Sequence, residues 1–174
     1  MKDSHCSACG APFPAGADWP RTCPSCATVA YRNPLPVAVA LLPVRGTDGT
    51  GLVVIRRAIQ PRLGRLALPG GFIDFGESWQ EAVVRELAEE TGIAASAADV
   101  VLADALTDSP GGYLLLFGLL PVRDAAELPP SRPTDETDGH RLLAEPAELG
   151  FELHTEAVRR WFAGDYAAPR TRTR

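Results

Sequence analysis

The sequence predicts an α/β protein with a small cysteine-rich module at its N-terminus. Apolar runs of strand length occupy positions 37–44, 51–57, 100–105 and 113–122. A capped amphipathic helix is predicted for residues 78–91, after a glycine-rich turn. Two Cys-x2-Cys pairs near the N-terminus contain all four cysteines of the chain.

The cysteine pairs predict a zinc ribbon that spans residues 1–33. The four cysteines are Cys6, Cys9, Cys23 and Cys26. This spacing is typical of a closed tetrahedral site, and a module of about 30 residues needs a metal to fold because its apolar core is too small. Two disulfides are the alternative, which we disfavour because the N-terminus lacks the apolar core of a secretory signal. His5 is expected to be a bystander beside the four thiolates.

The main domain is predicted to span residues 34–168, after a proline-containing linker at positions 32–36. Its first strand is expected at 37–44 and its second at 51–57, joined as a hairpin by a turn rich in glycine. A loop is expected at 59–65.

The predicted helix carries three glutamates on one face. Ser78 and Glu81 form a capping box, and Gly92 is a natural stop. At 100° per residue, the three side chains Glu86, Glu89 and Glu90 fall within an arc of about 100°. Such like charges repel one another, so a compensating cation is expected, and Mg²⁺ prefers oxygen ligands. A solvated acidic face is the alternative for the glutamates taken by themselves.

The spacing around this helix resembles the signature of the Nudix hydrolase family, G-x5-E-x7-R-E-U-x-E-E-x-G-U, with U an aliphatic residue. The positions that match are Gly71, Glu77, Arg85, Glu86, Leu87, Glu89, Glu90, Gly92 and Ile93. Every specified position is present, which makes the resemblance specific. It implies a Nudix α/β/α sandwich around a mixed sheet, preceded by the zinc ribbon.

The resemblance also implies Mg²⁺- or Mn²⁺-dependent hydrolysis of the diphosphate bond in a nucleoside diphosphate linked to another group. Glu86 and Glu90 would be the principal metal ligands, and Glu89 would complete the cluster or act as base. Arg85 would orient a glutamate by ion pairing. The backbone carbonyl of Gly70 would join the metal shell, with Asp74 as a weaker candidate.

Glu77 would hold the loop before the helix or reach the metal through water, by the same resemblance. Gly71 and Gly92 would support the motif. Arg56 and Arg57 lie at the end of the second strand, and one of them could face a phosphate. For each arginine taken by itself, a charge that faces solvent is the favoured interpretation.

Residues 124–139 are predicted to form a long acidic loop, which is typical of a functional segment. Family members often carry a further catalytic glutamate there, and Glu136 is the candidate. Asp135 and Asp138 compete for the role, and a solvated loop is an equal alternative. A strand is expected at 140–144.

A closing helix is expected at 154–162, in which Trp161 and Phe162 are assigned to packing. Residues 169–174 are predicted to be a disordered tail.

ADP-ribose and FAD are the favoured substrates, because zinc-ribbon Nudix proteins are linked to both. NADH stays open, although the S-Q-P-W-P-F-P-x-S motif of the NADH pyrophosphatase branch is missing. Pro110 lies near a proline associated with ADP-ribose hydrolases. The alternatives are a non-catalytic sensor that binds ADP-ribose or a similar nucleotide, and an RNA 5′-end processing hydrolase.

The formal net charge of −5 makes nucleic acid an unfavoured partner. No apolar run approaches the ~20 residues that span a bilayer, so no membrane partner is expected and a cytoplasmic location is predicted. The expected partner is a small-molecule nucleotide diphosphate derivative. The family resemblance leaves a homodimer open.

Overall fold

The computed structural model describes residues 3–47, 49–109 and 111–166. The chain forms two compact units, Met1–Pro34 and Leu35–Arg174, and each is described by itself. The predicted tail at 169–174 and Pro110 lie outside the described residues. None of the described helices is long and apolar enough to cross a membrane.

The first unit contains two turns with the same hydrogen bonds. The Gly10 amide donates to the Cys6 carbonyl over 2.8 Å, and the Ala27 amide donates to the Cys23 carbonyl over 2.9 Å. Both Gly10 and Ala27 have positive φ, at 74° and 59°. The second turn joins strands β1 (Arg21–Thr22) and β2 (Val29–Ala30), which pair antiparallel. Each Cys-x2-Cys pair therefore has the same backbone shape.

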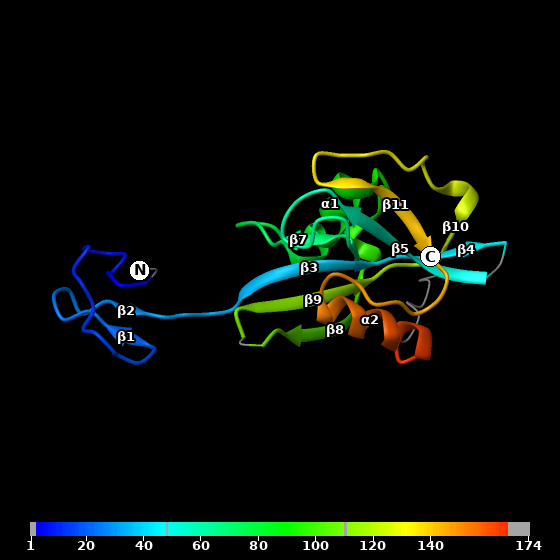
Figure 1. Cartoon of the computed structure of the whole chain (residues 1–174). Coiled ribbons are helices and arrows are strands. Elements are labelled where there is room, and N and C mark those ends of the chain that lie inside the picture. The colour runs from blue at the N-terminus through cyan, green and yellow to red at the C-terminus, as the bar shows by residue number, and fades with distance from the viewer. Residues whose placement is uncertain (1–2, 48, 110, 167–174) are drawn as a thin grey trace. The chain divides into compact units, whose positions relative to one another are not determined.

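The second unit contains two mixed sheets (Figure 1). The first has the order β7-β3-β9-β8, and the second has the order β10-β4-β5-β11 with β6 paired to β5. β3 is parallel to β9 and β10 is parallel to β4, whereas the other pairs are antiparallel. The strands are β3 Leu35–Leu41, β4 Pro43–Gly46, β5 Gly49–Arg57, β6 Leu66–Ala67, β7 Gly70–Phe72, β8 Val101–Thr107, β9 Tyr113–Leu119, β10 Arg123–Asp124 and β11 Thr137–Leu143.

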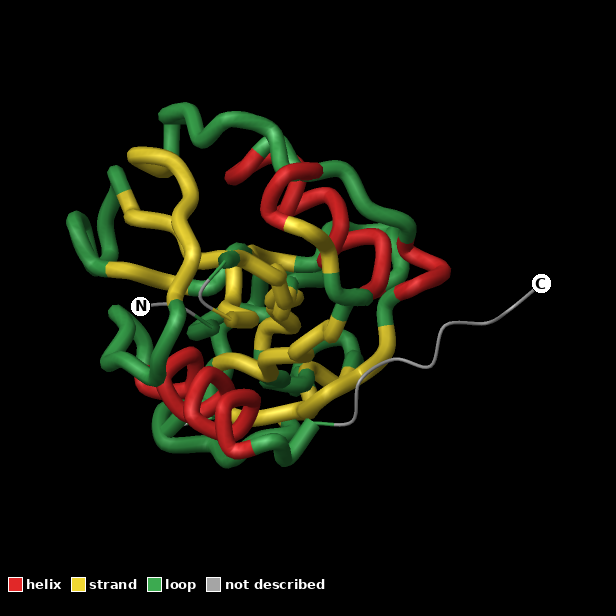
Figure 2. Tube along the Cα trace, turned by 90° about the vertical axis from the view of Figure 1, so that its right-hand side faces the viewer, coloured by secondary structure: helices red, strands yellow, loops and turns green. Residues whose placement is uncertain are grey.

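Two α-helices, α1 (Trp79–Thr91) and α2 (Glu152–Ala163), cover opposite faces of these strands (Figure 2). Successive side chains of a strand point to opposite faces, so β3 serves both. Its Val39 and Leu41 belong to the core that contains α2, and its Ala38 and Ala40 belong to the core that contains α1. The expected α/β/α sandwich is confirmed. Short 3-10 helices lie at Ala97–Asp99 and Ala125–Glu127.

The prediction of a single strand at 37–44 is wrong. The chain leaves one sheet after Leu41 and enters the other at Pro43, which lies in a different strand. Proline has no amide hydrogen and is confined to strand edges and starts. The expected hairpin is therefore formed by β4 and β5, with Gly46 paired to Gly49.

The predicted helix over residues 78–91 is confirmed with its caps. Ser78 is the N-cap, and its hydroxyl accepts the Glu81 amide hydrogen over 3.3 Å. The Glu81 carboxylate accepts the Ser78 amide hydrogen in return, over 2.7 Å. Gly92 ends the helix with a φ of 74°, a conformation that favours glycine. The caps define where the glutamate-bearing face begins and ends.

Two downstream elements begin earlier than expected. β11 starts at Thr137 rather than at position 140, so Glu136 directly precedes a strand. α2 starts at Glu152 rather than at position 154, which places His154 in its first turn. Trp161 and Phe162 pack against the core on the α2 side, with ring centroids 4.7 Å apart.

Candidate active site

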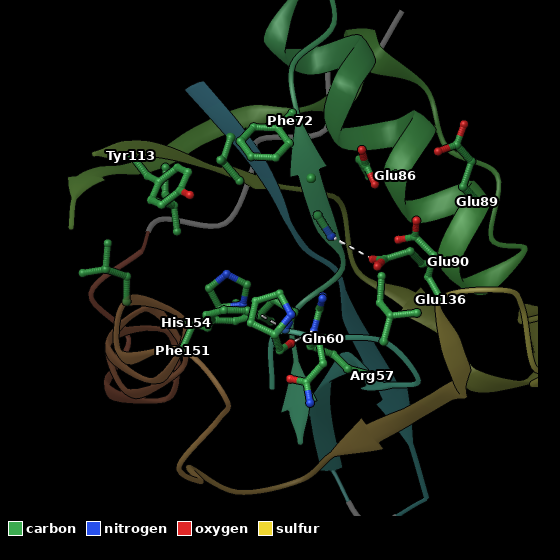
Figure 3. A pocket seen from close by; sticks show the side chains of 18 of the residues that line it. Arg57, Gln60, Phe72, Glu86, Glu89, Glu90, Tyr113, Glu136, Phe151 and His154 are labelled. Carbon is green, nitrogen blue, oxygen red and sulfur yellow. Dashed lines mark hydrogen bonds between the residues drawn. The ribbon is translucent and has the colours of Figure 1, made fainter. Parts of the chain in front are cut away.

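A cavity of about 1030 Å³ lies in the second unit, beside α1 and the start of α2 (Figure 3). Glu86, Glu89 and Glu90 reach it from α1, and Glu136 reaches it from the loop before β11. Figure 3 shows these four glutamates on one side of the cavity and the rings of Phe151 and His154 on the other. Side chains from distant parts of the sequence thus line one site.

Glu90 is the most enclosed of the glutamates, with 4% of its surface exposed. Its Oε2 accepts the Gly70 amide hydrogen over 2.9 Å. Burial, together with the smaller effect of the negative charges of Glu86 and Glu136, raises the pKa of Glu90 to about 8 despite this bond. A nearby cation would relieve this electrostatic cost.

Gly71 provides the room that the Glu86 carboxylate occupies. A Cβ at Gly71 would overlap the Glu86 carboxylate oxygens, so the position tolerates no side chain without displacing that group. Burial raises the pKa of Glu86, although its hydrogen bond with Arg85 opposes the shift. The glycine of the motif therefore acts sterically, through the glutamate that it faces.

Arg85 binds several groups of the motif at once. Its Nε and Nη2 donate to the two oxygens of Glu77, over 3.1 and 2.7 Å. Its Nη1 donates to Glu86 over 2.7 Å and to Glu89 over 3.1 Å. Its Nη2 also donates to the Phe72 carbonyl, over 3.0 Å. These contacts use all five guanidinium N–H groups.

Glu77 links the glycine-rich loop to Arg85. Its Oε1 accepts the Asp74 amide hydrogen over 2.7 Å, and both oxygens accept from Arg85. These bonds hold the pKa of Glu77 below its usual value, chiefly through Arg85. The expectation that Glu77 holds the loop agrees with this geometry. Asp74 itself lines the cavity.

Arg85 donates to Glu86 and Glu89, which the family resemblance predicts to be metal ligands. On that prediction, replacing Arg85 with lysine should lower kcat by about 10- to 100-fold, the usual cost of losing a group that orients metal ligands. An ammonium has three donors at one point and cannot span the Glu77, Glu86 and Phe72 acceptors. Steady-state kinetics on a hydrolysed substrate would measure the effect. Arg159→Lys, at an exposed helix position paired with Glu156, is the matched control. Equal activities of the two variants would contradict the orienting role.

The acidic loop contributes Glu136 and Asp135 to the cavity lining, whereas Asp138 forms an ion pair with Arg56 at 3.9 Å. The loop is tied to the glutamate helix, because the buried Thr137 hydroxyl donates to the Glu90 carbonyl over 3.1 Å. The Ala58 amide also donates to the Glu136 carbonyl over 2.8 Å. Both acidic candidates that precede β11 therefore face the site.

Arg57, rather than Arg56, is the strand-end arginine that lines the cavity. Its Nε donates to the Pro61 carbonyl over 2.8 Å, and its Cζ lies 5.4 Å from the Phe151 ring centroid. Its positive charge also lowers the pKa of Glu90, so it acts on the acidic end of the cavity. A phosphate between these groups would meet a positioned guanidinium.

The donor chemistry of the glutamate end fits a hard divalent cation. The candidate donors are the carboxylates of Glu86, Glu89, Glu90 and Glu136. In the structure Glu86 and Glu89 contact Arg85. Across the described ranges, the one group of three or more such side chains close enough to hold a metal ion is the cysteine set, whose ligand atoms lie within 4.8 Å of one another. The Gly70 amide donates to Glu90. The contact of the Gly70 carbonyl with a metal ion stays a prediction.

The four cysteines of the first unit bring their sulfur atoms together. Cys6 and Cys26 have Sγ atoms 3.7 Å apart, and those of Cys9 and Cys23 are 3.6 Å apart. A tetrahedral site with Zn–S bonds of about 2.3 Å requires sulfur separations of about 3.8 Å. Disulfide bonds would need about 2.05 Å. The four thiols are free and compatible with one zinc ion.

Sequence reasoning did not single out Phe151, His154, Phe72 and Tyr113 as site residues, although all four line the cavity. The rings of Phe72 and Tyr113 lie 6.1 Å apart, one from β7 and the other from the start of β9. No local pattern marks these positions, because the pairing of strands and the packing of α2 bring them to the site.

The model of the NUDIX domain matches residues 34–163. The chain belongs to the NUDIX domain family. Several structures share the fold of this NUDIX domain. A NUDIX hydrolase from Nitrosomonas europaea has a TM-score of 0.65 and 21% identity over 96% of both chains. The NUDIX domain of Shewanella oneidensis NrtR, complexed with ADP ribose, has a TM-score of 0.64 and 19% identity over 78% of this chain and 90% of that one.

Curated NUDIX relatives match shorter segments at higher identity. An ADP-ribose pyrophosphatase of Methanocaldococcus jannaschii is 46% identical over 63 residues, which are 36% of this chain and 37% of that protein. The mitochondrial NAD(P)H pyrophosphatase NUDT13 of Homo sapiens is 37% identical over 94 residues, 52% and 25% of the two chains. The NAD-capped RNA hydrolase NudC of Deinococcus radiodurans is 33% identical over 89 residues, 51% and 31% of the two chains. The alignments thus span only a quarter to about a third of the curated relatives' length.

Proposed function

We propose that this NUDIX protein is a divalent-metal-dependent pyrophosphohydrolase, which cleaves the diphosphate bond of a nucleoside diphosphate linked to another group. The observation that carries the proposal is the set of four glutamates, Glu86, Glu89, Glu90 and Glu136, at one end of a large cavity with Arg57 nearby. Hydrolases of phosphorus anhydrides need oxygen donors that can hold a metal ion, together with cationic groups, because charge on the phosphates must be neutralised.

The glutamates and the Gly70 carbonyl would hold Mg²⁺ or Mn²⁺. Such an ion, when bound, neutralises phosphate oxygens and lowers the pKa of water that attacks phosphorus. Arg85 keeps Glu86 and Glu89 oriented through its hydrogen bonds. Glu89, with 60% of its side chain exposed, is open to water and is the favoured group to accept a proton, and Glu136 is the alternative base. Arg57, which lines the same cavity and whose charge acts on Glu90, would contact a phosphate.

ADP-ribose and FAD are the favoured substrates, and NADH is a further candidate. The size of the cavity supports a dinucleotide-like ligand, because ligand sites usually measure about 300–1,000 Å³ and this one is at the upper end. The name of the Methanocaldococcus jannaschii relative and the ADP ribose complex of the NrtR NUDIX domain favour ADP-ribose. The names NAD(P)H pyrophosphatase and NAD-capped RNA hydrolase favour NAD-type ligands.

The substrate class can be tested by incubating the full chain with ADP-ribose, FAD, NADH, NAD⁺, diadenosine polyphosphate and a nucleoside triphosphate, followed by chromatography. We expect AMP from one or two of the dinucleotides. Tight nucleotide binding without turnover would support the sensor instead. An NAD-capped RNA belongs in the same panel, because cleavage that weakens steeply with salt would favour RNA 5′-end processing.

A further inference from the structure

The cavity has a second end with different chemistry. Phe151, Leu153 and His154, from the start of α2, form this wall, whereas the carboxylates lie across the cavity (Figure 3). The Phe151 and His154 ring centroids are 5.1 Å apart. Arg57 influences both ends, because it lies over Phe151 and its charge affects the pKa of Glu90 and of His154. It therefore marks the boundary between an anionic end and an aromatic end.

His154 is held as one neutral tautomer. Its Nδ1 accepts the Leu68 amide hydrogen over 3.2 Å, so that nitrogen carries no proton. A neutral imidazole with an unprotonated Nδ1 carries its hydrogen on Nε2. Burial lowers the pKa of His154 to about 3, and the Arg57 charge adds to the shift. The ring therefore offers one neutral donor, the Nε2–H group.

This donor has no partner in the protein but is not sealed off. Within residues 3–47, 49–109 and 111–166, the only hydrogen bond of the His154 side chain is the one from Leu68. In the same ranges, the one buried side-chain nitrogen or oxygen without a partner is His140 Nδ1. His154 Nε2 must therefore keep some contact with accessible space, and the residue lines the cavity.

We propose that the aromatic end is the subsite for the uncharged heteroaromatic base of the substrate, where Nε2–H of His154 donates to an acceptor atom of that base. The proposal rests on the proposed function, since it assigns the base of the nucleotide to this end. A phosphate on His154 itself fits poorly, because its Nε2–H is a single neutral donor that would not repay the desolvation of a charged group, whereas the positive charge of Arg57 lies at the boundary with the anionic end. A flat ring with lone pairs suits both the Phe151 face and the donor.

Binding of hydrolysis-resistant ligands tests this assignment without turnover. The probes are AMP, GMP, CMP and UMP, with ribose 5-phosphate as the analogue that lacks a base. Calorimetric titration of the full chain in Mg²⁺ buffer gives each Kd. We expect at least one nucleoside monophosphate to bind more tightly than ribose 5-phosphate, by about 10-fold or more, because a base adds stacking and a hydrogen bond.

Two substitutions of His154 separate its two hydrogen bonds. His154→Asn can keep the Leu68 contact, since its Oδ1 takes the place of Nδ1, but loses the donor. His154→Gln places an amide donor near the position of Nε2. The asparagine variant should weaken the preferred nucleotide by about 3- to 10-fold, as expected for one lost hydrogen bond, and leave ribose 5-phosphate unchanged. The glutamine variant should recover most of that loss.

Three results would overturn the subsite. The first is equal Kd values for all four nucleotides and ribose 5-phosphate. The second is a His154→Asn variant that weakens the affinity for the nucleotide and for ribose 5-phosphate by the same factor. The third is an equal loss of nucleotide affinity in the His154→Asn and His154→Gln variants. If the His154 variants fail to fold, Phe151→Leu, which leaves both partners of the Leu68–His154 hydrogen bond in place, should also weaken binding of the nucleotide and not of ribose 5-phosphate. Failure of the proposed function is a separate result, namely no hydrolysis of any diphosphate, and would leave these Kd differences unaffected.

Discussion

Glu90→Gln is expected to lower kcat by about 10³-fold, because it removes one charged oxygen from the proposed metal site, and such a ligand contributes several kcal/mol. The side chains have nearly equal volume, and the glutamine oxygen can still accept the Gly70 amide hydrogen that Glu90 accepts over 2.9 Å. The fold should therefore stay intact, as circular dichroism and thermal melting would show. Exposed Glu145→Gln, outside the cavity lining, is the matched control and should keep full activity.

The same variant should be more stable than the parent in metal-free buffer near pH 8. The pKa of Glu90 is about 8 in the folded protein, against an ordinary value of 4.5 for a glutamate, so the folded state binds more protons than the unfolded state between those pH values. Stability of the parent consequently falls as pH rises from about 4.5 to 8. The glutamine side chain does not titrate, so the variant does not lose this stability as the pH rises.

Unfolding of the Glu90→Gln variant, or turnover close to that of the parent, would contradict the assignment of Glu90 to the active site.

Cys23→Ser is expected to abolish zinc binding and unfold the first unit. Cys23 is buried and its Sγ lies 3.6 Å from that of Cys9, so loss of one thiolate opens the site. Structural zinc contributes about 10–16 kcal/mol in small modules, which have too little core to fold without it. Elemental analysis should find about one zinc ion per parent chain and almost none in the variant. Limited proteolysis should cleave the variant within residues 1–34.

The second unit should keep its melting transition in this variant, because Met1–Pro34 and Leu35–Arg174 are separate compact units. His5→Ala is the matched control, and it should retain zinc if His5 is a bystander. Loss of zinc from His5→Ala, or full zinc content in Cys23→Ser, would contradict the four-thiolate site.

The features that sequence predicted well depend on local signals. Helix α1 follows from Ser78, Glu81 and Gly92, whose capping bonds involve neighbours in the chain. The common face of the glutamates follows from helix periodicity alone. The clustering of the cysteines follows from two short turns of equal shape. None of these features needs knowledge of the distant parts of the fold.

The features that sequence missed depend on tertiary pairing. The apolar run at 37–44 contains one sign of its division, Pro43, but the residues on both sides of it are equally apolar and do not show that they join different sheets. Arg56 and Arg57 are chemically alike, and the strand alternation together with the position of Asp138 decides which one lines the cavity. His154 looked like an ordinary first-turn residue, and its role depends on Leu68, far away in the sequence.

Hydrolysis of ADP-ribose in ¹⁸O-labelled water, with and without Mg²⁺, tests the central claim most directly. If the glutamate end of the cavity activates water on a diphosphate, AMP and ribose 5-phosphate will appear only with Mg²⁺, and one of the two will carry a single ¹⁸O atom. The label will also identify the phosphorus that is attacked. Equal product formation without a divalent cation, or products that carry no label, would contradict the metal-dependent hydrolytic site.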